Sequence, residues 1–184
     1  MDLLSAIGLA LPAGLNAYIP LLGVALAQRF GVLSLAEPFD VLGEWWAIGL
    51  ITVLLLVELF ADKIPAVDHV NDVIQTFLRP AAGAIVMVAA SGKAGENYPL
   101  VMMGLGILLA GGVHAVKASA RPVVNTATGG AGAPVASILE DIAAAVSTVV
   151  AILMPILVIG VIAVMIWVAV RVYRRLNAAR ADGV

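Results

Sequence analysis

The chain has 184 residues, of which 62% are hydrophobic and only 12% are charged, with a formal net charge of −2. Soluble domains carry about 25% charged residues, so this composition excludes an ordinary soluble domain and predicts a single integral membrane domain over residues 1–184, with the lipid bilayer as its first partner. No cysteine is present, which excludes thiol catalysis and disulfides, and no basic tract suited to nucleic acid occurs.

Five stretches are apolar and long enough, at about 20 residues each, to cross a bilayer as helices. We expect them at residues 3–27, 45–61, 67–90, 100–116 and 142–170. The predicted fold class is therefore all-α, a multi-span transmembrane helical protein. Trp45 and Trp46 open the second span and are typical of residues at the membrane–water interface.

Prolines and glycines interrupt several of these spans. The first contains Pro12, Gly14, Asn16 and Pro20. Pro80 is expected to break or kink the third, because the residue before a proline disfavours the α region. The last span is too long for the hydrocarbon core and is expected to tilt, to kink at Pro155 or to protrude.

Arginines at the end of the last span predict the orientation. They are Arg171, Arg174, Arg175 and Arg180. Positive residues favour the cytoplasmic side, so we expect a cytoplasmic C-terminus in a bacterial cytoplasmic membrane. Five crossings then put the N-terminus on the opposite side.

The ionisable residues within this apolar chain form two clusters. The first contains Glu58, Asp62, Lys63, Asp68, Asp72 and Arg79, and the second contains His114, Lys117, Arg121, Glu140 and Asp141, with the uncharged Asn125 as a further candidate beside it. An ionised group at the bilayer centre costs about 2.5–3.5 kcal/mol even on lenient scales, so these positions need a reason to be charged. Together with Asn16, in the middle of the first span, they are the candidate binding residues.

Two readings of these clusters stay open. Glu58 and Asp62 share one helical face, as do His114 and Lys117, so an acidic stripe can meet a basic one. The pairs then either fasten two spans together or line a polar cavity. Glu140 and Asp141 are expected to cap the last helix or to face Arg121.

Metal binding and catalysis are not predicted. Asp68, His69 and Asp72 match no metal-ligand spacing, and a helix-capping role for Asp68 or Asp72 is favoured instead. The glycine-rich stretch 126–134 lacks the ending of a phosphate-binding loop and is expected to be a connection or a re-entrant loop. We expect no catalytic residue, no metal and no cofactor.

The two clusters resemble each other and predict an internal parallel repeat, with units at 45–90 and 99–155. Pro65-Ala-Val-Asp68 and Pro122-Val-Val-Asn125 both follow an apolar span, and a second proline follows each. Interrupted helices in repeated units are common at transporter binding sites. Glycines at 104, 106, 111 and 112 also give one span a smooth face for close helix contact, within the chain or in a homo-oligomer.

Several motifs point to one family. They are Gly14-Leu-Asn-Ala-Tyr-Ile-Pro20, Glu58-Leu-Phe-Ala-Asp62-Lys63-Ile-Pro65, Asn71-Asp72, Arg79-Pro80-Ala-Ala-Gly83 and Arg121-Pro122-Val-Val-Asn125. The chain resembles a bacterial integral membrane family catalogued as domain of unknown function 4126. The resemblance implies membership of that family and supplies neither a substrate nor a reaction.

From the residues, the predicted function is transport or permeation of a small polar or ionic solute. The alternative is a non-transporting protein that binds a lipid headgroup or a partner subunit. A membrane enzyme acting on a lipid phosphate is the third hypothesis.

Overall fold

The computed structural model describes residues 3–61, 65–129, 132–160, 163–164, 167 and 170–171, without the side chains of 65–72, 125 and 127. This described part is helical and contains no strand. Its α-helices are α1 (Leu3–Ala13), α2 (Tyr18–Arg29), α3 (Trp45–Ala61), α4 (Pro65–Ala90), α5 (Lys93–Asn97), α6 (Pro99–Thr128) and α7 (Gly132–Leu153). A short 3₁₀ helix at Phe39–Gly43 lies between α2 and α3, and a second at Pro155–Leu157 follows α7.

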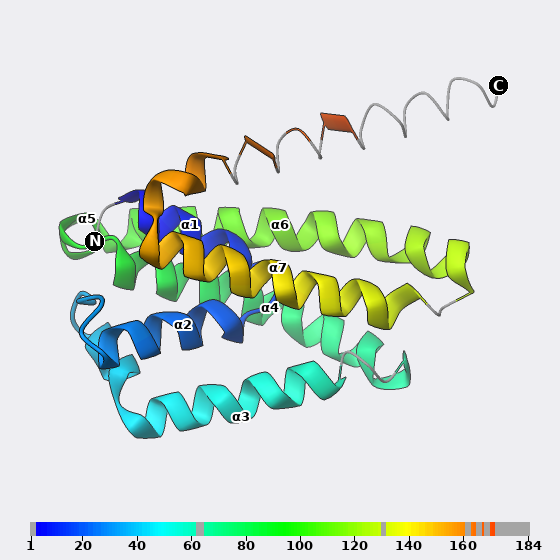
Figure 1. Cartoon of the computed structure of the whole chain (residues 1–184), viewed down its shortest axis with the longest axis horizontal. Coiled ribbons are helices and arrows are strands. Elements are labelled where there is room, and N and C mark those ends of the chain that lie inside the picture. Colours follow the sequence, from blue (N-terminus) through cyan, green and yellow to red (C-terminus); the bar gives the residue numbers. More distant parts are fainter. Residues whose placement is uncertain are drawn as a thin grey trace.

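The prediction of an all-α, multi-span membrane protein is confirmed. Segments of α4, α6 and α7 are each long and apolar enough to cross a membrane. The predicted second span is recovered as α3, a 17-residue apolar helix. These four helices run side by side along the long axis of the molecule (Figure 1).

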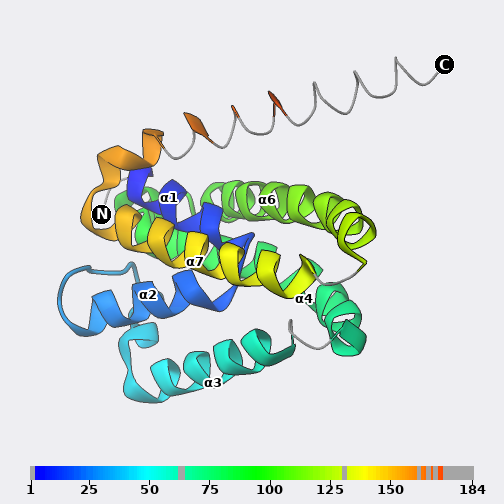
Figure 2. The same cartoon turned by 45° about the vertical axis from the view of Figure 1, so that its right-hand side comes forward.

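The first predicted span is wrong as a single crossing. Residues 3–27 form two helices, and the chain reverses between them, so α1 runs inward from one end of the bundle and α2 returns to that end (Figures 1 and 2). At 1.5 Å per residue α1 and α2 are about 16 and 18 Å long, roughly half of a 30 Å hydrocarbon core. We call α1 and α2 the re-entrant hairpin and residues 14–17 its tip.

The close approach of Gly14 to α6 explains where the hairpin turns. A Cβ at Gly14 would collide with the carbonyl oxygen of Ala110 and would lie 2.6 Å from the Cβ of Val113. Only glycine therefore lets the backbone of the tip reach α6 at this point. The reversal also moves the N-terminal end of α1 to the same end of the bundle as Arg29, against the sequence prediction.

Two prolines expected to interrupt the chain lie inside continuous helices. α4 runs through Pro80, and α6 runs through Pro122 to end at Thr128, twelve residues beyond the predicted limit at 116. Prolines are tolerated in membrane helices because neighbouring groups satisfy the freed backbone carbonyls.

The last predicted span, 142–170, is also corrected. α7 begins ten residues earlier, at Gly132, and ends at Leu153. Met154 leaves the helical region with φ −140° and ψ 67°, and Pro155 has no backbone donor to continue the helix. The predicted odd number of crossings therefore no longer follows from the span count.

Glycines set a close helix crossing between α4 and α6. A Cβ at Gly106 would lie 2.8 Å from the Cα of Ala84 and closer still to the carbonyl group of Gly83. Small residues at such crossings let membrane helices pack backbone to backbone. This contact fixes the facing sides of the helices that carry Arg79 and His114.

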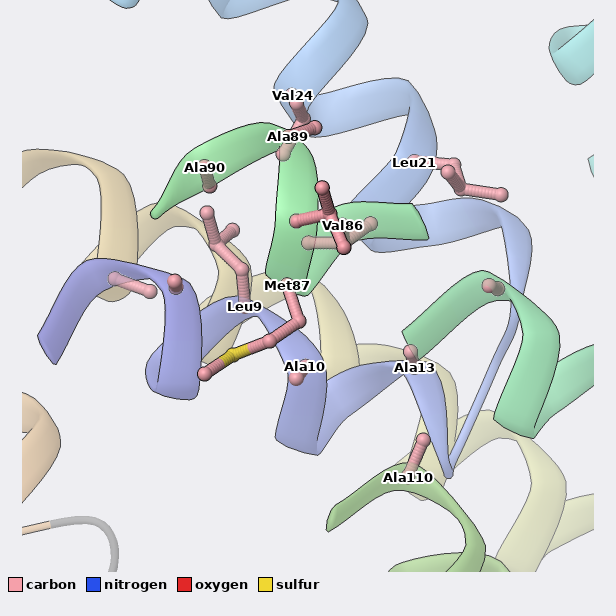
Figure 3. Close-up of a cluster of buried hydrophobic side chains, with 14 of the residues drawn as sticks. Leu9, Ala10, Ala13, Leu21, Val24, Val86, Met87, Ala89, Ala90 and Ala110 are labelled. Carbon is pink, nitrogen blue, oxygen red and sulfur yellow. The ribbon is translucent and has the colours of Figure 1, made fainter. Parts of the chain in front are cut away.

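The hydrophobic core fills one half of the bundle, around the hairpin. Leu9, Ala10 and Ala13 of α1 meet Val86, Met87 and Ala90 of α4, with Leu21 and Val24 of α2 beside them (Figure 3). Ala151 and Met102 belong to the same cluster and lie near the ends of α7 and α6 on that side. The half of the bundle that holds the hairpin is therefore apolar and closely packed.

Aromatic residues mark the surface at this end of the bundle. Trp45, Trp46 and Tyr98 are all exposed, and the guanidinium carbon of Arg29 lies 4.8 Å from the centre of the Trp45 ring. Such aromatics are typical of the membrane–water interface.

The proposed repeat units are both helical hairpins with the same direction of travel, α3–α4 and α6–α7 (Figure 1). Their prolines do not occupy matching positions, because Pro65 begins α4 whereas Pro122 lies inside α6. The internal repeat stays a prediction.

Candidate functional site

Charged side chains from four helices contact one another beyond the hairpin tip. Measured along the helix axes, Arg79 lies about 16 Å from the Ala90 end of α4, and Asp141 about 18 Å from the Leu153 end of α7. We define the charged layer as Glu58, Arg79, His114, Lys117, Arg121, Glu140 and Asp141. It begins at the hairpin tip, which contacts Lys117 and Asp141.

One half of the layer centres on Arg79, which is fully buried. Its Nη2 lies 3.2 Å from Glu58 Oε1, and its Nη1 lies 3.0 Å from Nδ1 of His114. The other ring nitrogen of His114 lies 3.1 Å from Oγ1 of Thr76. Arg79 therefore joins α3 to α6 through a buried ion pair and a histidine.

The other half centres on Glu140. Lys117 Nζ lies 2.7 Å from its Oε2, and Arg121 Nη2 lies 3.7 Å from the same oxygen. Lys117 and Arg121 stand one turn apart on α6, so both cations reach one carboxylate of α7. These ion pairs offset part of the cost of burying the three charges.

The tip of the hairpin is tied into this layer from both sides. Lys117 Nζ also donates to the carbonyl oxygen of Leu15 at 3.0 Å, and Asn16 Nδ2 donates to Asp141 Oδ1 at 3.0 Å. The Asn16 Oδ1 in turn accepts from the backbone N–H groups of Tyr18 and Ile19 at the start of α2. The Leu15 carbonyl of the tip and the first amides of α2 thus both have side-chain partners, as non-helical backbone inside a membrane protein requires.

All of the predicted site residues whose side chains are described take part in these contacts. They are Asn16, Glu58, Arg79, His114, Lys117, Arg121, Glu140 and Asp141. The pairing differs from the sequence prediction of α3 acids meeting α6 cations directly. Glu58 pairs with Arg79, and the α6 cations pair with Glu140, because α4 packs along α6 and brings Arg79 between α3 and α6.

Other predicted site residues cannot be compared. Asp62 and Lys63 lie outside the described residues, as do the side chains of Asp68, Asp72 and Asn125. The capping roles are corrected by the helix boundaries. Asp68 and Asp72 lie within α4, which begins at Pro65, and Glu140 and Asp141 lie within α7, which begins at Gly132.

Sequence reasoning missed two contributors. Thr76 has no charge to draw attention, although its place three residues before Arg79 puts it on the same side of α4. The Leu15 carbonyl is a backbone group, so the residue type does not identify it as a site atom. Only the neighbouring Gly14 and Asn16 indicate that the helix is interrupted there. Gln75, one turn before Arg79, is also buried, and its Oε1 has no hydrogen-bond partner.

Among the described residues no group of three or more His, Cys, Asp or Glu side chains is arranged to hold a metal ion. The layer offers instead mixed charges, a backbone carbonyl and an amide. Such a set can bind a small polar or charged species.

A family model described as Domain of unknown function (DUF4126) matches residues 3–175. The chain belongs to the DUF4126 family. The match covers both the hairpin and every residue of the charged layer, so the family assignment made from the motifs is confirmed. No curated protein and no solved structure matches this DUF4126 chain.

Proposed function

We propose that this DUF4126 protein moves a small polar or ionic solute across the membrane, with the charged layer and the hairpin tip as its central site. The observation that carries the proposal is the non-helical tip at mid-membrane depth, held by Lys117 and Asp141. Backbone leaves the helical form at this depth only where protein or a polar cavity satisfies it. Interrupted helices whose ends meet charged groups near the midplane are a common design of transporter sites.

The distribution of polarity along the bundle supports access from one side. The hairpin and the core around Leu9 and Met87 fill the half that carries Arg29 and Lys93. The charged layer begins beyond the tip and continues through Arg121 toward the turn between α6 and α7. A solute would reach the layer from that turn, and displacement of the hairpin would open the remaining half.

The proposed setting is the bacterial cytoplasmic membrane. Arg29 and Lys93 favour a cytoplasmic location for the end of the bundle that holds the hairpin, by the bias of positive residues toward the cytoplasm. The C-terminal arginines favour a cytoplasmic C-terminus by the same rule, and residues 172–184 lie outside the described part of the chain. The solute would then enter the layer from the outer side.

The second candidate is a non-transporting protein that binds a partner subunit or a lipid headgroup. The balanced pairs favour it, since Glu58 with Arg79 and Glu140 with Lys117 neutralise each other as structural ion pairs do. The third hypothesis, a lipid-phosphate enzyme, has no described group that supports it.

Flux through reconstituted vesicles tests the proposal. Wild-type protein is compared with Asp141→Asn, which keeps an acceptor for Asn16 but removes one charge of the layer, and with Lys93→Met, an exposed control. We expect flux of at least one tested ion or small polar solute, a fall of about 10-fold or more in Asp141→Asn, and no change in Lys93→Met. Absence of flux for every solute tested, with the protein folded in the vesicles, would contradict transport and favour the binding candidate.

A further inference from the structure

The Lys117 ammonium contacts two oxygen atoms at the hairpin tip. It lies 3.0 Å from the Leu15 carbonyl oxygen and 2.7 Å from Glu140 Oε2. The next residue along α7, Asp141, accepts from Asn16, which is the next residue along the tip. Two adjacent residues of the tip therefore contact this part of α7, Leu15 through the Lys117 ammonium to Glu140 and Asn16 directly to Asp141.

The negative pole of a half-helix favours a cation at this position. Leu15 follows the last turn of α1, where the backbone carbonyls no longer have helical partners. Free carbonyls at the end of a half-helix are the groups that bind small cations in interrupted membrane helices. The opposite pole, at the start of α2, is already satisfied because Asn16 Oδ1 accepts from Tyr18 and Ile19, so it does not present donors to an anion.

The charge balance of the layer also favours a cation over an anion at this site. The described acids Glu58, Glu140 and Asp141 match the described cations Arg79, Lys117 and Arg121 in number. Removing the Lys117 ammonium leaves this set with one excess negative charge. One monovalent cation restores neutrality, and no described cluster of acids is large enough to require a divalent ion.

We infer that the hairpin tip is a monovalent-cation site, formed by the Leu15 carbonyl and the Glu140 carboxylate, which the Lys117 ammonium fills in this conformation. The inference rests on the proposed function, and it names the solute class as a small monovalent cation that competes with Lys117. Withdrawal of the ammonium would both vacate the site and release the tip from α6.

Thermal unfolding of the purified protein in matched salts tests the site without any flux measurement. The Lys117→Ala variant is unfolded in NaCl, KCl and choline chloride at equal ionic strength. We expect Na⁺ or K⁺ to raise its unfolding midpoint by roughly 4 °C over choline, because a ligand that binds only the folded state stabilises it. The wild type, with its site filled, is expected to unfold at the same temperature in all three salts.

The double variant Lys117→Ala/Glu140→Gln is the matched control, and it should lose the preference for Na⁺ or K⁺ over choline. If Lys117→Ala does not accumulate, Lys117→Gln replaces it, because its amide keeps a donor for the Leu15 carbonyl while removing the charge. Equal unfolding midpoints in the three salts for Lys117→Ala, or for Lys117→Gln where it replaces Lys117→Ala, would overturn the cation site.

The unfolding assay tests the cation site and the flux assay tests transport, so one can give a negative result while the other is positive. A cation-specific shift without any flux would keep the site and remove transport. Flux of an anion or a neutral solute, with no cation-specific shift, would keep transport and overturn this inference.

Discussion

Asn16 donates from its Nδ2 to Asp141 Oδ1 at 3.0 Å, across 125 positions of the chain. The same side chain caps α2, since its Oδ1 accepts from the amides of Tyr18 and Ile19. One buried amide therefore caps the second half of the hairpin and anchors the turn to α7. The position of the tip depends on this polar contact as well as on the packing of Gly14 against α6.

Exchanging the two side chains tests that dependence. Asn16→Asp keeps the cap but faces a second carboxylate at Asp141, so we expect a loss of about 2–4 kcal/mol in the free energy of unfolding. Asp141→Asn alone should cost less, because an amide oxygen still accepts. The double variant Asn16→Asp/Asp141→Asn restores one amide and one carboxylate and should recover most of the loss in detergent unfolding assays. Equal losses that simply add would mean that the two residues are not coupled.

Arg79 is the residue whose loss should damage the fold most. Arg79→Met leaves the buried Glu58 carboxylate without its Arg79 partner, and breaking a buried ion pair costs about 3–5 kcal/mol. Since whole domains are stable by only about 5–15 kcal/mol, we expect strongly reduced accumulation in the membrane, measured by quantitative blotting.

The double variant Glu58→Gln/Arg79→Met separates a charge effect from a packing effect. It removes both charges and should regain much of the abundance, while Lys93→Met, at an exposed site, should match the wild type. Abundance that stays as low in the double variant as in Arg79→Met would show that the Arg79 side chain matters for its shape and its contact with His114 instead.

The crossing of α4 and α6 offers a matched pair of glycines. A Cβ at Gly106 would press into the backbone of Gly83 and lie 2.8 Å from the Ala84 Cα, whereas a Cβ at Gly104 would meet nothing within 4 Å. Gly106→Ala should therefore lower the stability by about 1–3 kcal/mol through overpacking. Gly104→Ala on the same helix should be neutral or stabilising by up to about 1 kcal/mol through helix propensity. Similar unfolding midpoints for the two variants would contradict the close crossing.

Much of the fold follows from the sequence, because span length and composition are local properties. The α3 boundaries were predicted as observed, and the polar interruption at Gly14 and Asn16 was recognised. The reversal at that interruption could not be predicted. An apolar stretch of 25 residues satisfies the length rule whether it crosses once or folds into two halves, and the choice depends on the distant partners Ala110 and Asp141.

The candidate site was predicted in composition but not in pairing. Charged residues are rare in an apolar chain, so Glu58, Arg79 and Lys117 could be recognised as candidate site residues from the sequence alone. Their partners depend on helix rotation, which changes if a helix stops at Pro80 or continues through it. Since α4 continues, Arg79 lies opposite Glu58 and His114, a relationship that no spacing rule contains.

The last prediction tests the hairpin itself, and the absence of cysteine makes the experiment clean, since every thiol signal comes from an introduced residue. Single cysteines are placed at Leu3, Ser34, Lys93 and Thr128, all exposed. A membrane-impermeant thiol reagent is then applied to either face of oriented membrane vesicles. Because α1 and α2 return to one end of the bundle, Leu3→Cys should react from the same face as Ser34→Cys and Lys93→Cys, and Thr128→Cys from the opposite face (Figure 1). A single crossing over residues 3–27 would instead put Leu3→Cys with Thr128→Cys, and that result would remove the mid-membrane tip on which the proposed solute site depends.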